Sequence, residues 1–476
     1  MHLLLFLAVP LFAQTSCADM ARLPNVTAAL QTVTYCRVSI TLRPAADSEI
    51  KSEIWLPAAP VWNGKLLLEG GGGLVGSINT EGMTHAVREG YASASTDTGH
   101  SGSGGRFALG HPDKITDFAY RAVHGTAIEA KALIAAYYGR GPRFSYWEGC
   151  STGGRQGLMS AQRYPEDFDG IIAGAPAYNQ TYISAWRMRL LMTALKSPQH
   201  ALPAEKLKVL NDAVLDKCDG KDGVKDRLIE NPRNCNFDPS VLKCNGTDTA
   251  SCLTPQQLET VNTAYSDLRS STGELLYPHL PFGGELGWRL PAVATEPGAI
   301  DVDTFRYIGN QDPAWDWRSF DLEKDIDRAL LHEKEIHAVD PDLAKFKGHG
   351  GKLLMYHGWS DGGSGGSISA LNTVSYYESV LKQMGPNQDD WFRLFLVPGM
   401  DHCGGGTGPN QFNKIAVLER WREQDEPPKS ITAARVNESG VIDMTRPLCP
   451  YPQQAVYNGS GSTNDAANFT CRVKGN

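Results

Sequence analysis

The residues best suited to chemistry lie at positions 149–153, which read GCSTG and match the pattern G-x-S-x-G. Aromatic residues at 144–147 (FSYW) favour a strand before this pentapeptide, and the pattern from Gln156 onward favours a helix after it. A serine on a sharp strand-to-helix turn presents its hydroxyl to a cleft, as a nucleophile must. The sequence therefore predicts Ser151 as the nucleophile of an acyl-transfer enzyme. The alternative is a glycine-rich loop with an incidental serine.

A serine hydroxyl is a weak nucleophile, so it needs a base to take its proton and an acid to orient that base. In an α/β-hydrolase these residues follow one another in the order Ser, Asp or Glu, His, each after a strand. The apolar run 352–356 (KLLMY) is followed by Asp361, and the run 392–397 (FRLFLV) is followed by His402. This order predicts Asp361 as the acid and His402 as the base.

Three nearby residues are weaker candidates for the same roles. Asp401 is adjacent to His402, and adjacent residues seldom direct their side chains at each other. His357 precedes Asp361 in the same loop, where we expect it to pack or to hydrogen-bond locally. Ser364 lies in a second G-x-S-x-G pattern at 362–366, but no acid on a following strand separates it from the histidine. We therefore do not assign Ser364 as the nucleophile.

Backbone N–H groups are needed to stabilise the oxyanion that forms when a serine attacks an ester. Residues 65–69 (KLLLE) predict a buried strand, and four consecutive glycines at 70–73 follow it. Glycines let the backbone approach a ligand closely, and their N–H groups can point at an anion. We expect the N–H of Thr152 and one from the glycine loop, represented by Gly72, to form the oxyanion hole. The alternative is a flexible turn.

The elements that must position these residues alternate between strands and helices. Further strands are predicted at 91–98 and 168–173, and residues 115–138 predict a long amphipathic helix. Strands that alternate with helices, with the chemistry in loops at strand ends, indicate a doubly wound sheet. The predicted fold class is therefore α/β, in its α/β-hydrolase form. The helix would bury one face made of Ala119, Val123, Ala127, Ala130, Ile134 and Tyr137.

This alternation is lost between about residues 178 and 346, a segment rich in Asp, Pro, Trp and Cys. Core strands resume after it, so we interpret it as an inserted lid domain over the strand ends and not as a tandem domain. Residues 1–13 are apolar and end in Ala13, which resembles a short signal peptide without Lys or Arg at its start. The predicted core comprises residues 14–177 and 347–476, and the predicted lid comprises residues 178–346.

Charge and composition narrow the partners and the compartment. The chain of 476 residues has a net charge of -8, which argues against nucleic acid and anionic membranes as partners. After the first segment no apolar run approaches the ~18 residues needed to span a bilayer. The ten cysteines are an even number, which in an exported chain indicates disulfide bonds. We therefore expect a secreted or periplasmic protein.

Two cysteines flank the predicted catalytic residues. Cys150 directly precedes Ser151 and Cys403 directly follows His402, so a disulfide between them would clamp the two loops together. With the stretches GCSTGGRQG and HGWSD, this Cys-Ser…Asp…His-Cys arrangement resembles the tannase and feruloyl esterase family of secreted α/β-hydrolases. The resemblance covers nearly the whole mature chain. It implies that the family's nucleophile, acid, base and clamp correspond to Ser151, Asp361, His402 and the Cys150–Cys403 pair.

The remaining cysteines are expected to pair with near neighbours in the sequence. The predicted pairs are Cys17–Cys36, Cys218–Cys235, Cys244–Cys252 and Cys449–Cys471.

A second motif lies in the predicted lid, where residues 218–228 read CDGKDGVKDRL. Three aspartates in a glycine-bearing loop suit a hard cation such as Ca²⁺, which takes six to eight oxygen ligands. The spacing is not that of an EF-hand, because no Glu stands at the twelfth position. The resemblance implies a structural calcium ion, and the alternative is a solvated acidic turn. Its implied ligands are the side chains of Asp219, Asp222 and Asp226 and the carbonyls of Val224 and Leu228.

These features together predict a secreted serine esterase that acts through an acyl-enzyme. The resemblance implies small esters of aromatic acids, such as ferulate, other hydroxycinnamates or gallate, as substrates. Alternatives are a hydrolase of terephthalate monoesters on the same scaffold, an exported serine carboxypeptidase, and a binding protein that has kept the fold. Trp288, Trp315 and Trp317 are candidate walls for an aromatic acyl group, although each is more readily explained as part of the lid core.

Overall fold

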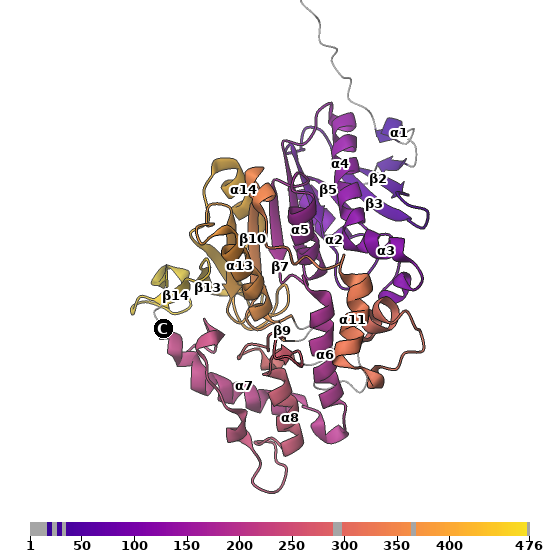
Figure 1. Ribbon diagram of the computed structural model, residues 1–476. Helices are drawn as coiled ribbons and strands as arrows, with labels where there is room; N and C mark the ends of the chain where they lie inside the picture. The colour runs from indigo at the N-terminus through magenta and orange to yellow at the C-terminus, as the bar shows by residue number, and fades with distance from the viewer. Residues whose placement is uncertain (1–16, 21–25, 31–34, 289–297, 363–367, 474–476) are drawn as a thin grey trace, which may run out of the picture.

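The computed structural model describes residues 17–20, 26–30, 35–288, 298–362 and 368–473. The predicted signal peptide and the second G-x-S-x-G serine, Ser364, lie outside the described residues. Figure 1 shows a sheet flanked by helices, with the magenta segment after β7 lying beyond one end of the strands.

A nine-stranded mixed sheet forms the centre of the molecule, in the order β1-β2-β3-β5-β4-β6-β7-β10-β11. The strands from β5 to β11 in this order run parallel, whereas β1, β2, β3 and β5 pair antiparallel. This arrangement confirms the predicted α/β class. The strands are β1 (Val26–Leu30), β2 (Tyr35–Leu42), β3 (Ile50–Pro57), β4 (Lys65–Glu69), β5 (Ala92–Thr96), β6 (Phe144–Cys150), β7 (Gly170–Gly174), β10 (Lys352–Gly358) and β11 (Phe392–Val397).

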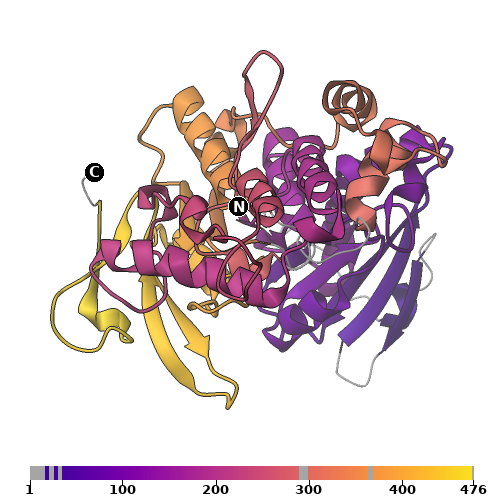
Figure 2. The same ribbon diagram turned by 90° about the horizontal axis from the view of Figure 1, so that it is seen from below.

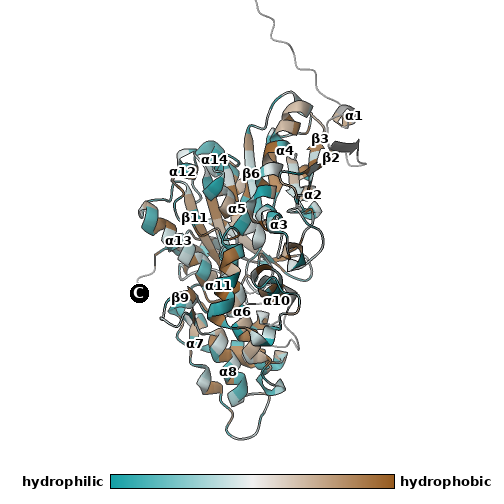
Figure 3. Ribbon diagram, turned by 45° about the vertical axis from the view of Figure 1, so that its right-hand side comes forward, coloured by the Kyte–Doolittle hydropathy of each residue, from teal (hydrophilic) through white to brown (hydrophobic). Residues whose placement is uncertain are grey.

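Successive residues of a strand point to opposite faces of the sheet, and the central strands carry apolar residues on both faces. Helices therefore cover both faces. Leu66 and Leu68 of β4 belong to a hydrophobic cluster that includes residues of α4, α5 and α13, whereas Leu67 between them belongs to a cluster that includes residues of α2 and α14. Figure 3 shows hydrophobic residues concentrated in the central strands and hydrophilic ones on outer helices such as α14. These helices are α2 (Thr80–Arg88), α4 (Ala122–Tyr138), α5 (Thr152–Arg163), α13 (Ala370–Met384) and α14 (Lys414–Gln424).

The long helix predicted at 115–138 is interrupted. It consists of α3 (Pro112–Thr116), a π-helical stretch at Asp117–Arg121 and α4. The predicted face is buried as far as Ile134, but Tyr138, four residues further on, is buried in place of the predicted Tyr137. The buried Asp117 in this stretch accepts hydrogen bonds from Arg121 and Ser48.

The segment between β7 and β10 contributes no described strand to the main sheet and has a hydrophobic core of its own, which includes Trp186, Leu210 and Val261. Viewed from below, this magenta segment lies in front of the sheet (Figure 2). Its assignment as a separate lid domain remains a prediction. Its elements are α6 (Gln180–Ala194), α7 (Ala204–Cys218), α8 (Pro255–Ala264), β8 (Leu268–Arg269), β9 (Leu275–Tyr277), α10 (Ala299–Asp303), α11 (Leu322–Glu333) and α12 (Ala344–Gly348).

Smaller elements complete the two ends of the described chain. A short helix, α1, lies at the N-terminal end, and two antiparallel strand pairs follow α14. Among the described residues, no helix is both long and apolar enough to cross a membrane. These elements are α1 (Cys17–Met20), β12 (Ile431–Val436), β13 (Ile442–Leu448), β14 (Gln454–Tyr457) and β15 (Phe469–Arg472).

Five disulfides join all ten cysteines, so disulfide bonding is confirmed. The partners are Cys17–Cys36, Cys150–Cys403, Cys218–Cys235, Cys244–Cys252 and Cys449–Cys471.

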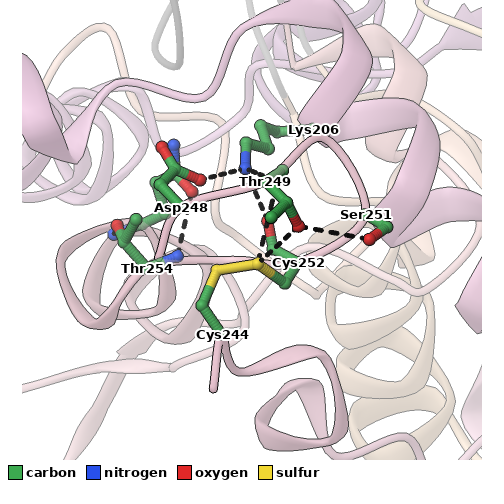
Figure 4. The surroundings of a disulfide bond; sticks show 8 residues. Lys206, Cys244, Asp248, Thr249, Ser251, Cys252 and Thr254 are labelled. Carbon is green, nitrogen blue, oxygen red and sulfur yellow. Dashed lines mark hydrogen bonds and ion pairs between the residues drawn. A yellow bond between two sulfur atoms is a disulfide. The ribbon is translucent and has the colours of Figure 1, made fainter. Parts of the chain in front are cut away.

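The Cys244–Cys252 disulfide closes a small loop that a buried lysine ties to α7 (Figure 4). The ammonium group of Lys206 donates to Asp248 Oδ1 at 2.6 Å and to the carbonyls of Thr249 and Cys252 at 2.5 and 2.6 Å. Three acceptors offset the cost of burying this charge. Although Cys244, Asp248 and Cys252 cluster closely, both sulfurs are committed to the disulfide, so the cluster is structural.

Candidate active site

The predicted nucleophile lies on a strained turn between β6 and α5. Ser151 has φ 63° and ψ -119°, which is a rare conformation for a residue with a side chain, and α5 begins at the next residue. Its N–H donates to the carbonyl of Gly174 at 2.9 Å, which holds the turn against β7. A Cβ atom on Gly149 would lie 2.6 Å from the backbone of Gly153, so the crossing of strand and helix requires glycine there.

The predicted base and acid are in contact. His402 donates from Nδ1 to Asp361 Oδ2 at 2.6 Å, and the Asp361 side chain is fully buried. Burial on its own would raise the pKa of Asp361, but the two imidazoles beside it hold that pKa at about 2. Burial would likewise lower the pKa of His402, but the carboxylate of Asp361 raises it above its usual value. The arrangement therefore favours an ion pair whenever His402 takes a proton.

His357 also contacts Asp361. The sequence predicted that His357 packs or hydrogen-bonds locally, but it did not identify Asp361 as the partner. Its ring is fully buried, and Nε2 lies 3.0 Å from both Asp361 Oδ2 and the carbonyl oxygen of Ile368. Because both partners are acceptors, Nε2 carries the proton, and Nδ1 accepts from the Thr373 hydroxyl at 2.7 Å. His357 and His402 thus both contact Oδ2 of Asp361, and His357 helps to fix the acid in place.

A disulfide joins the two loops that carry the nucleophile and the base. Cys150 and Cys403 are bonded at 2.07 Å, with their Cα atoms 5.9 Å apart. The bond links the residue before Ser151 to the residue after His402, so it limits how far these loops can separate.

Ser151 and His402 both line a cleft of about 1050 Å³. Because Asp361 occupies Nδ1 of His402, Nε2 is the ring atom left for chemistry in the cleft. The glycine loop after β4 forms another part of the wall, and residues of the inserted segment complete it. The inserted segment contributes Arg187, Leu191, Gly298, Ile300 and Asp301.

Hydrogen bonds hold the glycine loop against β6 and α5. The N–H of Gly70 donates to the carbonyl of Glu148 at 2.9 Å, and the N–H of Gly71 donates to Gln156 Oε1 at 3.2 Å. Thr152 donates from its hydroxyl to the Gly73 carbonyl at 2.8 Å. Gly72 lines the cleft. Thr152 is buried and is not among the described residues that line the cleft. The contribution of Gln156 was missed, because its contact joins residues distant in sequence.

The three tryptophans considered as walls belong to the core of the inserted segment. Trp288 is 1% exposed and Trp315 is 9% exposed, and Trp317 packs against the same cluster. None of the three is among the described residues that line the cleft. The aromatic-wall interpretation is therefore wrong for these residues, since their large rings are used to bury the apolar faces of the segment's own helices. The apolar side chains that line the cleft include Leu74, Val75, Ile78, Leu191 and Ile300 instead.

The predicted calcium-binding loop is compact and acidic. The Asp219 carboxylate accepts from the N–H groups of Asp226 and Arg227 at 3.3 and 3.0 Å, and Asp222 accepts from Val224 N at 2.9 Å. Burial raises the pKa of Asp222 to about 6, and Asp226 forms an ion pair with Arg446. Among the described residues, these three carboxylates do not converge to within 4.8 Å of one another.

Glu230 adds a carboxylate to this loop that the sequence did not single out. Its side chain accepts from Ala455 N at 2.9 Å, and burial raises its pKa to about 7. Glu230 lies near Asp222 and Asp226, and the buried guanidinium of Arg446 pairs with Asp226 and lies near Glu230. Carboxylate oxygens are the donors that a hard divalent cation requires, so the residues fit Ca²⁺ in composition.

Comparison with known proteins gives a consistent result over most of the chain. A family model described as tannase and feruloyl esterase matches residues 36–472. A probable feruloyl esterase B-1 of Aspergillus fumigatus is 32% identical over 467 residues, covering 94% of this chain and 87% of that protein.

Solved structures agree with this match. The crystal structure of an esterase from Aspergillus oryzae superimposes with a TM-score of 0.90 at 31% identity, over 96% of this chain and 99% of that one. The crystal structure of feruloyl esterase B from Aspergillus oryzae has a TM-score of 0.87 at 31% identity, over 98% of this chain and 95% of that one.

Proposed function

The chain belongs to the tannase and feruloyl esterase family, and we propose that it hydrolyses esters of aromatic acids with Ser151 as nucleophile, His402 as base and Asp361 as the acid. As a member of this family it is a carboxylic ester hydrolase. One observation carries the residue assignment. Ser151 and His402 line the same cleft while His402 is bonded through Nδ1 to the buried Asp361.

The chemistry follows from this arrangement. Nε2 of His402 takes the proton of Ser151 as Oγ attacks the ester carbonyl, and Asp361 stabilises the imidazolium that forms. The N–H groups of Thr152 and Gly72 would stabilise the oxyanion. The carbon–oxygen bond to the alcohol then breaks, and His402 returns the proton to the departing alcohol. Water, deprotonated by the same imidazole, hydrolyses the acyl-enzyme and frees Ser151.

The expected substrates are esters of phenolic acids, such as ferulate, other hydroxycinnamates or gallate. One relative is named a probable feruloyl esterase and another a feruloyl esterase, and the cleft volume of about 1050 Å³ lies at the upper end of small-molecule sites. A terephthalate monoester is the second candidate, because its aromatic acid also presents a flat ring to the apolar surface of Leu191 and Ile300.

Side-by-side hydrolysis of methyl ferulate, methyl gallate and a terephthalate monoester tests this proposal. We expect the highest kcat/KM for a phenolic ester, with little cleavage of a carboxypeptidase substrate measured in parallel. Preference for the terephthalate monoester would select the second candidate. Cleavage of the peptide alone would contradict the esterase assignment.

We also propose that the loop at residues 218–228 binds a structural calcium ion through Asp219, Asp222, Asp226 and the carbonyls of Val224 and Leu228. Its support is the group of carboxylates gathered at this loop, namely Asp219, Asp222, Asp226 and Glu230. Purified protein should contain close to one calcium per chain by elemental analysis, and Asp222→Asn should lose it. The matched control Asp216→Asn, which changes an exposed acid on α7, should keep it. Wild-type protein without calcium at neutral pH would contradict this proposal.

Export from the cytoplasm is likewise a proposal, supported by the five disulfides. Expression with its own N-terminus in a secreting host should yield a chain that begins after Ala13. N-terminal sequencing that still finds Met1 on the protein in the medium or periplasm would contradict cleavage at this position.

A further inference from the structure

The sheet contributes polar groups to the cleft that the proposed esterase chemistry does not use. Glu69 at the end of β4, Glu148 on β6 and Tyr356 on β10 all line it. Glu69 and Glu148 are partners in the register of the two parallel strands, so their side chains leave the sheet on the same face. Tyr356 belongs to the hydrophobic cluster on that face.

Glu69 is a buried carboxyl group without a hydrogen-bond partner in the described part of the chain. The residue is 9% exposed, yet it lines the cleft. Burial, with the adjacent charge of Glu148, raises the pKa of Glu69 well above its usual value. The protonated carboxyl can both donate and accept a hydrogen bond. The Glu69 carboxyl group therefore keeps hydrogen-bonding capacity that a ligand in the cleft can use.

The hydroxyl of Tyr356 is in the same situation. The residue is 3% exposed, and no hydrogen bond to its hydroxyl is found among the described residues. The ring lies across Gly174, where an added Cβ would be 2.5 Å from the phenolic oxygen. Since the Gly174 carbonyl accepts from Ser151 N, the hydroxyl lies beside the nucleophile turn.

Glu148 is held by a lysine that neutralises it. Lys414 Nζ is 3.3 Å from Glu148 Oε1 and 5.4 Å from the centre of the Tyr356 ring. Because Lys414 offsets the charge of Glu148, the group presents carboxyl and phenol oxygens that can hydrogen-bond to uncharged hydroxyl groups. Glu148 precedes Ser151 by three residues. Three residues of an extended strand span about 10 Å, so Glu148 lies within that distance of the nucleophile along the chain.

We propose that Glu69, Glu148 and Tyr356 form a subsite for the hydroxyl groups of the alcohol part of the ester, namely a sugar or another polyol. This inference rests on the proposed esterase function. Apolar side chains elsewhere in the cleft suit the aromatic acyl group, namely Leu74, Val75 and Ile78 of the core and Leu191 and Ile300 of the inserted segment. The carboxyl and phenol groups on the sheet then face the alcohol, where adjacent hydroxyls can bond to more than one of them.

Three esters distinguish hydroxyl groups on the alcohol from hydroxyl groups on the acid: methyl cinnamate, methyl caffeate and monocinnamoyl glycerol. Cinnamoyl glycerol adds hydroxyls to the alcohol alone, and methyl caffeate adds them to the acid alone. We expect Tyr356→Phe and Glu69→Met each to lower the ratio of kcat/KM for cinnamoyl glycerol over methyl cinnamate by roughly ten-fold, as loss of a buried hydrogen bond predicts. Tyr356→Phe removes a hydroxyl without a protein partner, so folding should be preserved.

Tyr137→Phe is the matched control, because it removes a partly buried phenolic hydroxyl on α4 that does not line the cleft. It should leave this ratio unchanged. An unchanged ratio in both subsite variants would overturn the inference. A fall confined to methyl caffeate relative to methyl cinnamate would overturn it as well, since the hydroxyls bound would be those of the acid. Failure of the wild-type protein to cleave any of the three esters would contradict the proposed function itself.

Discussion

At the scale of single residues, the candidate site depends on side chains whose surroundings change their chemistry. Ser151 is held at positive φ by backbone hydrogen bonds and by glycines on either side. Asp361 is a buried carboxylate that stays ionised because two imidazoles contact it. The positive φ of Ser151 and the buried charge of Asp361 each cost free energy, so the surrounding structure must hold both residues in place.

Replacing the nucleophile provides the most direct test at this scale. Ser151→Ala should lower kcat for an activated aryl ester by at least ~10³-fold, because the attacking hydroxyl is gone, while the melting temperature changes little. Steady-state kinetics and thermal denaturation measure the two quantities. Ser364→Ala, in the second G-x-S-x-G pattern, is the matched control and should retain activity. Loss of activity in the control but not in Ser151→Ala would identify the other serine as the nucleophile.

The pH dependence of kcat/KM should follow the titration of His402. A general base works only when neutral, and Asp361 raises the pKa of His402 above its usual value of 6.5. Activity should therefore rise with pH through a midpoint above 6.5 and be lost below it. Asp361→Asn removes the carboxylate, so its residual activity should show this midpoint at lower pH. A wild-type midpoint well below 6.5, or one that does not move in Asp361→Asn, would argue against the pairing.

At the scale of elements, the junction between β6 and α5 sets the geometry of the nucleophile. The helix begins directly after the serine and packs so close to the strand that glycine is the only residue accommodated at several positions. The glycine loop after β4 is fastened to the same helix through Gln156 and Thr152. Nucleophile and candidate oxyanion donors therefore share one rigid support.

Gly149→Ala should disturb this junction. Its Cβ would lie 2.6 Å from the backbone of Gly153, so strand and helix must separate, which costs about 1–3 kcal/mol of stability and displaces Ser151. Chemical denaturation and kcat on an aryl ester should both report the change. Gly141→Ala is the matched control, because nothing lies within 4 Å of its added Cβ. Equal stability and activity in the two variants would refute the proposed constraint.

At the scale of the whole molecule, the sheet order brings distant loops together. β4 and β6 are neighbours although β5 and the helices α2, α3 and α4 lie between them in the chain, so the glycine loop meets the nucleophile turn. Ligands of doubly wound sheets bind at such a change of direction in strand order. The Cys150–Cys403 bond then connects the two halves of the core across a sequence separation of 253 residues.

This long-range bond should matter more than a short one. The Cys150→Ala/Cys403→Ala variant should lose roughly 5 kcal/mol at most by the chain-entropy model, and its kcat should fall as the catalytic loops loosen. The Cys449→Ala/Cys471→Ala control opens a loop with a sequence separation of 22 and should lose less stability and little activity. Denaturation and kinetics at a temperature where both are folded measure the difference. Equal kcat in the two double variants would contradict a catalytic contribution from the clamp.

Much of the fold was predictable from sequence because its signals are local. Apolar runs define β10 and β11, and a glycine-flanked serine after an aromatic strand defines the nucleophile turn. The order of Ser151, Asp361 and His402 along the chain also suffices to name them as candidates. None of these inferences requires knowledge of which strands are adjacent.

Only the tertiary structure could decide which side chains meet. The contact of His357 with Asp361, the hold of Gln156 on the glycine loop and the burial of Trp288 all depend on packing between distant segments. The grouping of Glu69, Glu148 and Tyr356 depends on the order and register of β4, β6, β7 and β10. Register is set by the summed burial of both sheet faces, a long-range property that no local pattern in the sequence records.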